Sequence, residues 1–177
     1  MDTLKDYGGP VVWVSHDRDE VYRRCPQVCV MDRGRTMPVE DMKQMFACPE
    51  TVTAARLSGC KNYTPMENAG GTKVFLPEWN LTLDCGRPIP AGAGVLGVRS
   101  HFIGPQFPEN RFACQVEQVV ENVFSMVILV RPVGADQKVP AIRLEMEKEL
   151  WQQYGGEGEL RIGIHPKDLL LLREEEL

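Results

Sequence analysis

His16 is the residue whose type and position best suit it to chemistry. It follows Val11 to Val14, an apolar run after two glycines and a proline that predicts a buried strand. Proteins of the α/β class place ligand-contacting groups just past the ends of such strands. An imidazole there can donate a charge-assisted hydrogen bond to an anionic oxygen. A lone histidine in this position is more often structural, so its neighbours decide how it is interpreted.

The segments after His16 predict part of an α/β layer. Asp17 to Arg24 reads as a charged helix that Pro26 cannot continue, and Val28 to Met31 reads as a second buried strand. Gly34 then supplies a tight turn. Two further helices are expected, the second one starting with Pro49 in its first turn and ending at Gly59. They are Glu40 to Phe46 and Glu50 to Ser58.

Beyond Gly59 the sequence changes to short apolar runs separated by turn residues, a pattern that predicts a small barrel or sandwich. One helix, Glu145 to Tyr154, interrupts the series before two glycines. The predicted strands are Thr72 to Leu76, Asn80 to Leu83, Val95 to Arg99, Phe112 to Val120, Phe124 to Val130, Ala141 to Leu144, Leu160 to Ile164 and Leu169 to Leu172.

Two segments of this β-rich part echo each other. Gly97 to Ile103 and Gly163 to Leu169 both read as a strand that runs into a turn and resumes. The similarity could reflect two alike half-barrels or arise by chance.

The neighbours of His16 resemble a known family. Pro10 to Val21, with its Ser-His-Asp centre, resembles the switch-histidine segment of ABC transporter ATPases, and Val28 to Arg35 resembles the strand and Gly-Arg turn that follow it. The resemblance implies that His16 is the catalytic switch histidine, which contacts the γ-phosphate of ATP in the complete subunit. Such a contact strengthens as charge builds up on the transferring group.

The rest of the ATPase machinery is missing from this sequence. It contains no G-x-x-x-x-G-K-[ST] loop and no strand ending in Asp-Glu before His16. Leu57 to Cys60 looks like the start of the family's signature loop, but it follows His16 and is better read as a helix end. We therefore expect ATP and Mg²⁺ to act only in the complete subunit, and the present chain to be inactive alone.

The β-rich part resembles the transport-associated OB domain of importers for maltose, sulfate and molybdate. Gly59-Cys60-Lys61-Asn62 and Gly97-Val98-Arg99-Ser100 resemble two of its marks, and Gly163 to Leu172 resembles its closing strand. The expected fold is α+β and mainly β. Residues 1–58 form the C-terminal edge of an α/β ATPase domain, and residues 59–177 form an OB-like β-barrel accessory domain.

That resemblance also implies partners. We expect a second copy of the chain, the transmembrane permease subunits, and molybdate, tungstate or sulfate, with the protein on the cytoplasmic side, peripheral to the cell membrane. Lys61, Asn62 and Arg99 are the candidate ligand-binding residues, although capping and surface roles explain them as well. Phe112 to Pro132 looks closest to molybdate-type subunits.

Composition argues against other classes of function. The formal charge is −5 and Lys and Arg do not cluster, which weakens the alternative of an independent OB-fold module that binds nucleic acid. A free-standing enzyme using His16 with Asp17 or Asp19 lacks an identifiable nucleophile. The six cysteines are scattered without a C-x-x-C pair, so no metal site is expected. No apolar run reaches the roughly 20 residues of a membrane span.

Overall fold

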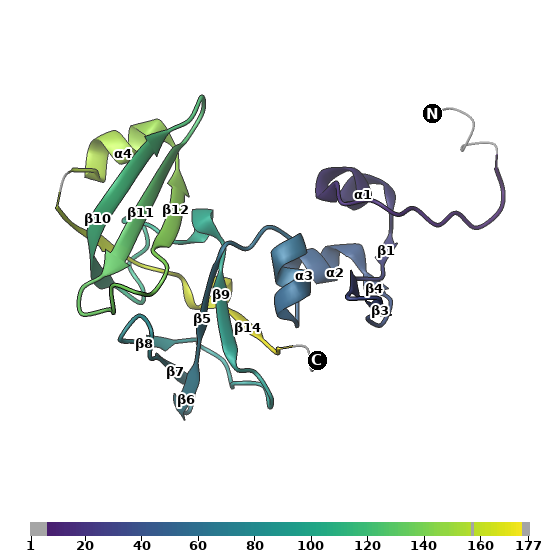
Figure 1. Cartoon of the computed structure of the whole chain (residues 1–177), viewed down its shortest axis with the longest axis horizontal. Coiled ribbons are helices and arrows are strands. Elements are labelled where there is room, and N and C mark those ends of the chain that lie inside the picture. The colour runs from purple at the N-terminus through teal and green to yellow at the C-terminus, as the bar shows by residue number, and fades with distance from the viewer. Residues whose placement is uncertain (1–6, 157, 175–177) are drawn as a thin grey trace.

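The computed structural model describes residues 7–156 and 158–174, and it is mainly β with four short α-helices. Short helices and two-residue strands form the first third of the chain, and three sheets form the rest (Figure 1). The first third contains α1 (Arg18–Arg24), β1 (Gln27–Val28), β2 (Met31–Asp32), β3 (Arg35–Thr36), β4 (Glu40–Asp41), α2 (Met42–Ala47) and α3 (Val52–Leu57). The prediction of an α+β, mainly β chain is confirmed.

The helix predicted after His16 is confirmed as α1, and its cap explains where it begins. The Asp17 carboxylate accepts hydrogen bonds from the backbone N–H groups of Asp19 and Glu20, both at 3.0 Å. Acidic side chains in the first turn and Arg23 and Arg24 in the last turn complement the helix dipole.

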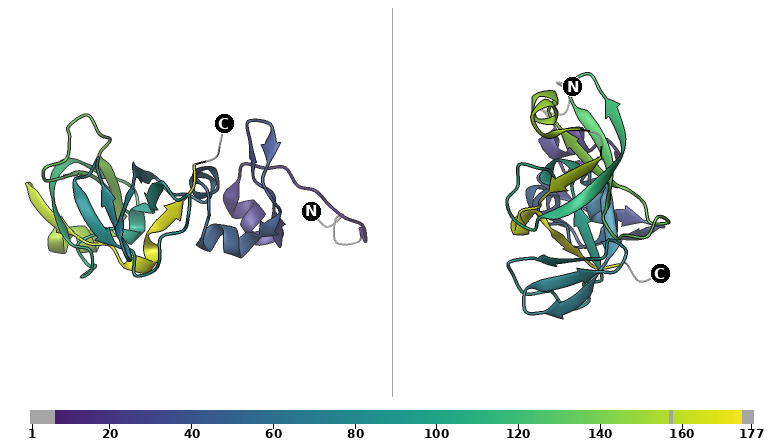
Figure 2. Two further views of the ribbon diagram at one scale, coloured as in Figure 1. Left: turned by 90° about the horizontal axis from the view of Figure 1, so that it is seen from below. Right: turned by 90° about the vertical axis from the view of Figure 1, so that its left-hand side faces the viewer.

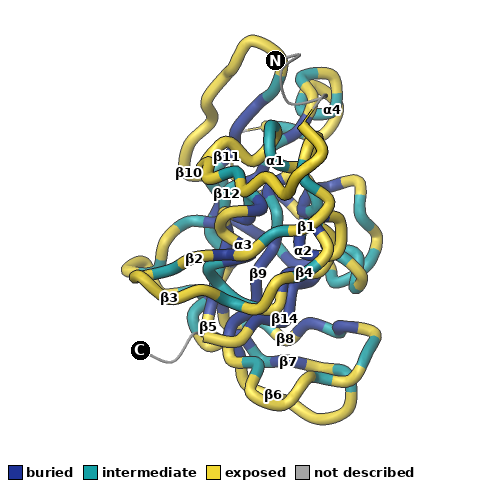
Figure 3. The backbone as a smooth tube through the Cα atoms, turned by 90° about the vertical axis from the view of Figure 1, so that its right-hand side faces the viewer, coloured by how far each residue is buried: buried dark blue, intermediate teal, exposed yellow. Residues whose placement is uncertain are grey.

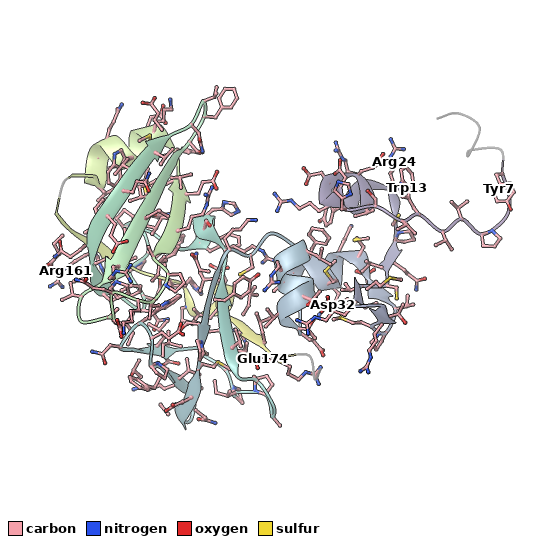
Figure 4. The ribbon with its side chains drawn as sticks, viewed as in Figure 1. Tyr7, Trp13, Arg24, Asp32, Arg161 and Glu174 are labelled. Carbon is pink, nitrogen blue, oxygen red and sulfur yellow. The ribbon has the colours of Figure 1, made fainter. Side chains whose placement is uncertain are left out.

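The buried strand predicted for Val11 to Val14 is not present. These residues have no regular secondary structure, and the side chains of Val12 and Val14 are 90% and 93% exposed. A strand needs a neighbour for its backbone hydrogen bonds, and no strand of the described residues pairs with this run. Figure 3 shows the segment as an exposed arm leading to α1. Only Trp13 is half-buried, with the Arg24 guanidinium 5.8 Å from its ring centre (Figure 4).

The second strand predicted in this part, Val28 to Met31, is split into β1 and β2, and Val30 between them is buried. β1 pairs with β4, while β2 and β3 form a hairpin. Arg33 and Gly34 at its turn have φ values of 46° and 79°. Positive φ at both central residues is what a tight two-residue hairpin requires, so the predicted turn at Gly34 is confirmed.

Among the described residues, the β-rich part contains ten strands, one α-helix and two 3₁₀ helices. The eight strands predicted from sequence are all present, and β5 and β6 are additional. They are β5 (Asn62–Pro65), β6 (Glu67–Gly70), β7 (Lys73–Leu76), β8 (Leu81–Asp84), β9 (Val95–Val98), β10 (Phe112–Glu121), β11 (Met126–Pro132), β12 (Ile142–Met146), β13 (Glu159–Ile162) and β14 (Leu170–Leu172), with α4 (Lys148–Tyr154) between β12 and β13.

These strands form three antiparallel sheets with the orders β12-β11-β10-β13, β14-β9-β5 and β6-β7-β8. The sheets curl around one apolar core, seen from two sides in Figure 2. Trp79, Leu76, Leu96, Ile128 and Ile162 come from all parts of this region and are almost fully buried. The expected OB-like domain is therefore built from three sheets that share a core, without one continuous ladder of strands.

The two echoing segments have the same local fold. After β9, the 3₁₀ helix η2 (Ser100–Phe102) leads to buried Ile103; after β13, the 3₁₀ helix η3 (Pro166–Asp168) leads to buried Leu169. Gly104, directly after the first segment, and Gly163, at the start of the second, exchange backbone hydrogen bonds of 3.1 and 2.9 Å.

Helix α3 packs on both parts of the chain. Ala54 belongs to a small cluster with Val30, Met42 and Met45, whereas Ala55 packs with Cys60, Val95, Leu170 and Leu172. The helix ends at Gly59, whose φ is +96°, with the N–H groups of Gly59 and Cys60 donating to the carbonyls of Arg56 and Ala55. This is a Schellman motif, which confirms that Leu57 to Cys60 is a helix end.

Candidate functional site

His16 lies on the exposed arm just before α1. The residues around it are organised for capping: the Ser15 hydroxyl accepts from the Asp17 N–H at 3.0 Å, and Asp17 in turn caps α1. The imidazole is exposed and thus free to meet a group supplied from outside the described residues. Nothing in this part of the chain surrounds His16 with the other groups of a catalytic centre.

Asn62 is buried in the β-rich part and joins three strands. Its side-chain amide donates to the carbonyls of Val98 at 3.2 Å and Arg143 at 2.9 Å, and its oxygen accepts from the Arg143 N–H at 2.7 Å. Both amide hydrogens are therefore already used within the protein. An anion could bind Asn62 only by displacing one of these bonds.

Arg99 and Lys61 have different surroundings. Arg99, between β9 and η2, is half-buried; its Nη2 donates to the Ser58 hydroxyl at 3.0 Å and to the Phe46 carbonyl at the end of α2. Lys61 is exposed and does not line the same pocket. Of the candidate ligand residues, the structure thus brings Arg99 to Ser58 and keeps Lys61 and Asn62 apart from that contact.

Arg99 lines an open pocket of about 420 Å³ between the helices of the first part and the two 3₁₀ helices of the β-rich part. The pocket has polar, cationic and aromatic walls drawn from five separate segments. Its lining residues are Tyr22, Lys43, Phe46, Ala47, Ser58, Arg99, His101, Phe102, Lys167, Asp168 and Leu170.

The charge of this pocket is positive although the whole chain carries −5. Lys43, Arg99 and Lys167 supply three cations and Asp168 one carboxylate, with His101 beside them. Such a local excess attracts anions, because pockets with walls of low dielectric constant focus the field of their charges. Sequence reasoning missed Lys43, His101 and Lys167. Arg99 was a candidate from the start, and the echo between Gly97–Ile103 and Gly163–Leu169 was the one sequence signal that linked its segment to the one that carries Lys167.

The buried thiols of the β-rich part are unsuited to nucleophilic chemistry. Burial raises the pKa of Cys85 to about 11 and that of Cys114 to about 12, and it also raises the pKa of Cys60. Tyr63, which donates to the Cys60 carbonyl at 3.0 Å, likewise has a pKa raised by burial. All four groups therefore remain protonated at neutral pH.

The described residues 7–156 and 158–174 contain no group of three or more His, Cys, Asp or Glu side chains that could hold a metal ion. Within the same residues, none of the helices has both the length and the apolar character needed to span a bilayer.

Comparison with known proteins supports the resemblance to importer ATP-binding subunits. The chain is 27% identical over 154 residues to the sulfate/thiosulfate import ATP-binding protein CysA of Vibrio cholerae. The match covers 83% of this chain, more than the two thirds made up by residues 59–177, so it extends into the first part as well. It covers 37% of the relative, so this chain spans well under half of that protein's length. The resemblance to importer ATP-binding subunits is thereby confirmed.

No protein-family model matches the chain. Among solved structures, the cytoplasmic molybdate-binding protein ModG, with molybdate bound, aligns with a TM-score of 0.46 and 13% sequence identity, over 62% of this chain and 94% of that one.

Proposed function

We propose that this chain is the C-terminal regulatory portion of the ATP-binding subunit of an oxyanion importer. Its sequence is related to importer ATP-binding subunits over most of its length. The observation that carries the proposal is the match to the sulfate/thiosulfate import ATP-binding protein, which runs through both parts of the chain. In that role the chain supplies one ATPase residue, His16, and a β-rich accessory domain, while ATP and Mg²⁺ bind mainly to segments outside it.

The exposed arm supports this role. Val12 and Val14 are almost fully exposed and alternate with half-buried Trp13, an unfavourable state for apolar side chains in water. A strand-forming run of this kind becomes buried when a neighbouring sheet pairs with it. In the proposed subunit, the preceding ATPase segments supply that sheet and place His16 at its edge.

The proposed ligand of the accessory domain is a tetrahedral oxyanion, with molybdate or tungstate preferred to sulfate. The preference follows the resemblance of Phe112 to Pro132 to molybdate-type subunits. The site is the pocket beside Arg99, where Lys43 and Lys167 add hydrogen-bond donors. Oxyanions take strong, charge-assisted bonds from such donors.

Saturating oxyanion is expected to raise the melting temperature of the purified chain. Ligand at a hundred times its dissociation constant stabilises a folded protein by about 2.7 kcal/mol, which is about 5–10 °C for a protein of this size. Differential scanning fluorimetry with molybdate, tungstate and sulfate, and with chloride at equal ionic strength as control, measures the shift. Equal melting temperatures in all four salts would remove the oxyanion role and leave an assembly module.

The chain is also expected to associate with a second copy of itself, because ATP-binding subunits of this class work as pairs related by a two-fold axis. The run Val127 to Val130 is largely buried in the chain's own core and is unavailable, whereas Val123 and Phe124 at the β10–β11 tip are 78% and 89% exposed. Light scattering at tens of micromolar should show a dimer that weakens in Phe124→Ser. A monomer at every concentration would contradict the prediction.

A further inference from the structure

We propose that the pocket lined by Lys43, Arg99 and Lys167 binds a small organic anion, in which a phosphate or carboxylate group is attached to an apolar, preferably aromatic, body. The inference rests on the anion-binding role proposed above and goes further in the class of ligand. It follows from three properties of the pocket: its size, the placement of its charges and its aromatic wall.

The size of the pocket exceeds the needs of a bare oxyanion. Its volume of about 420 Å³ is more than ten times the ~30 Å³ that one water molecule occupies in the liquid. It lies within the range of about 300–1,000 Å³ typical of pockets for small organic ligands. A five-atom oxyanion bound by the cations would leave most of this space to solvent.

The cations converge from elements far apart in the sequence. Lys43 comes from α2, Arg99 from the start of η2 and Lys167 from η3. Among the residues that the structure describes, Arg99 donates hydrogen bonds through Nη2, and its Nε and Nη1 hydrogens are the ones that a ligand would take. Asp168 is the one carboxylate in the lining, so the charge excess favours an anionic group.

Aromatic side chains form part of the pocket wall. Tyr22 of α1 and Phe46 of α2 meet edge to face, with ring centres 4.9 Å apart, and Phe102 of η2 completes the lining. Tyr22 remains 45% exposed, so apolar surface is available to a ligand. Burying it against a ring adds to the free energy of binding, which inorganic anions cannot do.

Titration calorimetry on the whole chain tests the proposal, with phenyl phosphate, benzoate, inorganic phosphate and molybdate as probes. We expect phenyl phosphate to bind at least tenfold more tightly than inorganic phosphate. Removing both lysines, as Lys43→Gln with Lys167→Gln, should weaken phenyl phosphate binding by about tenfold or more, the loss typical of charged hydrogen bonds. Lys138→Gln removes an exposed lysine outside the pocket and should leave binding unchanged.

A separate variant tests the aromatic wall. Tyr22→Ser should reduce the preference for phenyl phosphate over inorganic phosphate while leaving the affinity for inorganic phosphate nearly unchanged. Lys43, Lys167 and Tyr22 are all exposed, so circular dichroism is expected to show an intact fold in each variant. Relative binding of benzoate and phenyl phosphate identifies whether carboxylates or phosphates are preferred, and either result supports an organic anion.

The failures of the two proposals are distinguishable. Equal affinity for phenyl phosphate and inorganic phosphate, or binding unaffected by the double lysine substitution, would overturn the organic-anion inference. If molybdate still raised the melting temperature in that case, the oxyanion role would stand alone. Binding of phenyl phosphate without any response to molybdate, tungstate or sulfate would support the inference and reject oxyanion sensing.

Discussion

His16→Ala is expected to slow ATP turnover by about a hundredfold to a thousandfold in a subunit reconstructed with the preceding ATPase segments. The imidazole is exposed at the end of the Val11–Val14 arm. In the proposed subunit it contacts a phosphate held by those segments. Loss of one hydrogen bond that strengthens in the transition state costs about 3–4 kcal/mol. Steady-state phosphate release by the wild-type and variant subunits measures the difference.

The control for His16 is the present chain alone. Because the side chain is exposed and packs in none of the three core clusters, His16→Ala should leave the melting temperature of this chain unchanged. Gln137→Ala, a substitution of another exposed polar residue, outside both the pocket and the β10–β11 tip, should leave turnover of the reconstructed subunit unchanged. Turnover at the wild-type rate in His16→Ala would show that the histidine has no catalytic part.

Gly163→Ala is expected to destabilise the β-rich part by about 3 kcal/mol or more, at the upper end of the cost of overpacking. An added Cβ would lie 2.3 Å from the Phe107 carbonyl oxygen and 2.6 Å from that of Glu109. Both are backbone atoms, so the clash cannot be relieved by the movement of a side chain and the backbone itself would have to shift. The same backbone holds the pair of hydrogen bonds between Gly104 and Gly163.

Gly94→Ala is the matched control for this substitution. Gly94 also has backbone hydrogen bonds, to Met66 and Leu172, but an added Cβ there meets nothing within 4 Å. Urea unfolding followed by tryptophan fluorescence gives both free energies of unfolding. A difference of less than about 1 kcal/mol between the two variants would show that the backbone around Gly163 yields easily.

The sequence predicted correctly those elements whose conformation depends on a few neighbouring residues. The charged run from Asp17 to Arg24, ended by Pro26, predicted α1, and Gly34 and Gly59 marked a turn and a helix end that only positive φ values allow. The apolar runs of the β-rich part predicted eight strands because each has a face buried in one shared core.

The failures came from structure that depends on distant neighbours. Val11 to Val14 has the composition of a buried strand, yet no strand of the described residues pairs with it. Conversely, β5 and β6 were missed because the proline in one and the glycine in the other are poor strand formers, and pairing with β9 and β7 holds them in place.

The candidate site was predicted only in part for the same reason. Arg99 was identified from its place at a strand end, but its partners Lys43 and Lys167 lie more than fifty residues away on either side. No spacing rule connects such residues before the fold brings them together. Asparagine is a common ligand-binding residue, so Asn62 was a reasonable candidate. Its hydrogen bonds to the backbone of β9 and β12 show that its side chain instead joins strands within the protein.

The position of α3 has a mechanical consequence. Its neighbouring residues Ala54 and Ala55 belong to different cores, and Arg173 after β14 is paired through its backbone with Glu50 and Val52. Because α3 packs against both clusters, it cannot rotate without disturbing the packing of each. A displacement of one cluster therefore also displaces the other. A displacement of the cluster formed by Val30, Met42, Met45 and Ala54 would therefore be passed through α3 to the sheet β14-β9-β5.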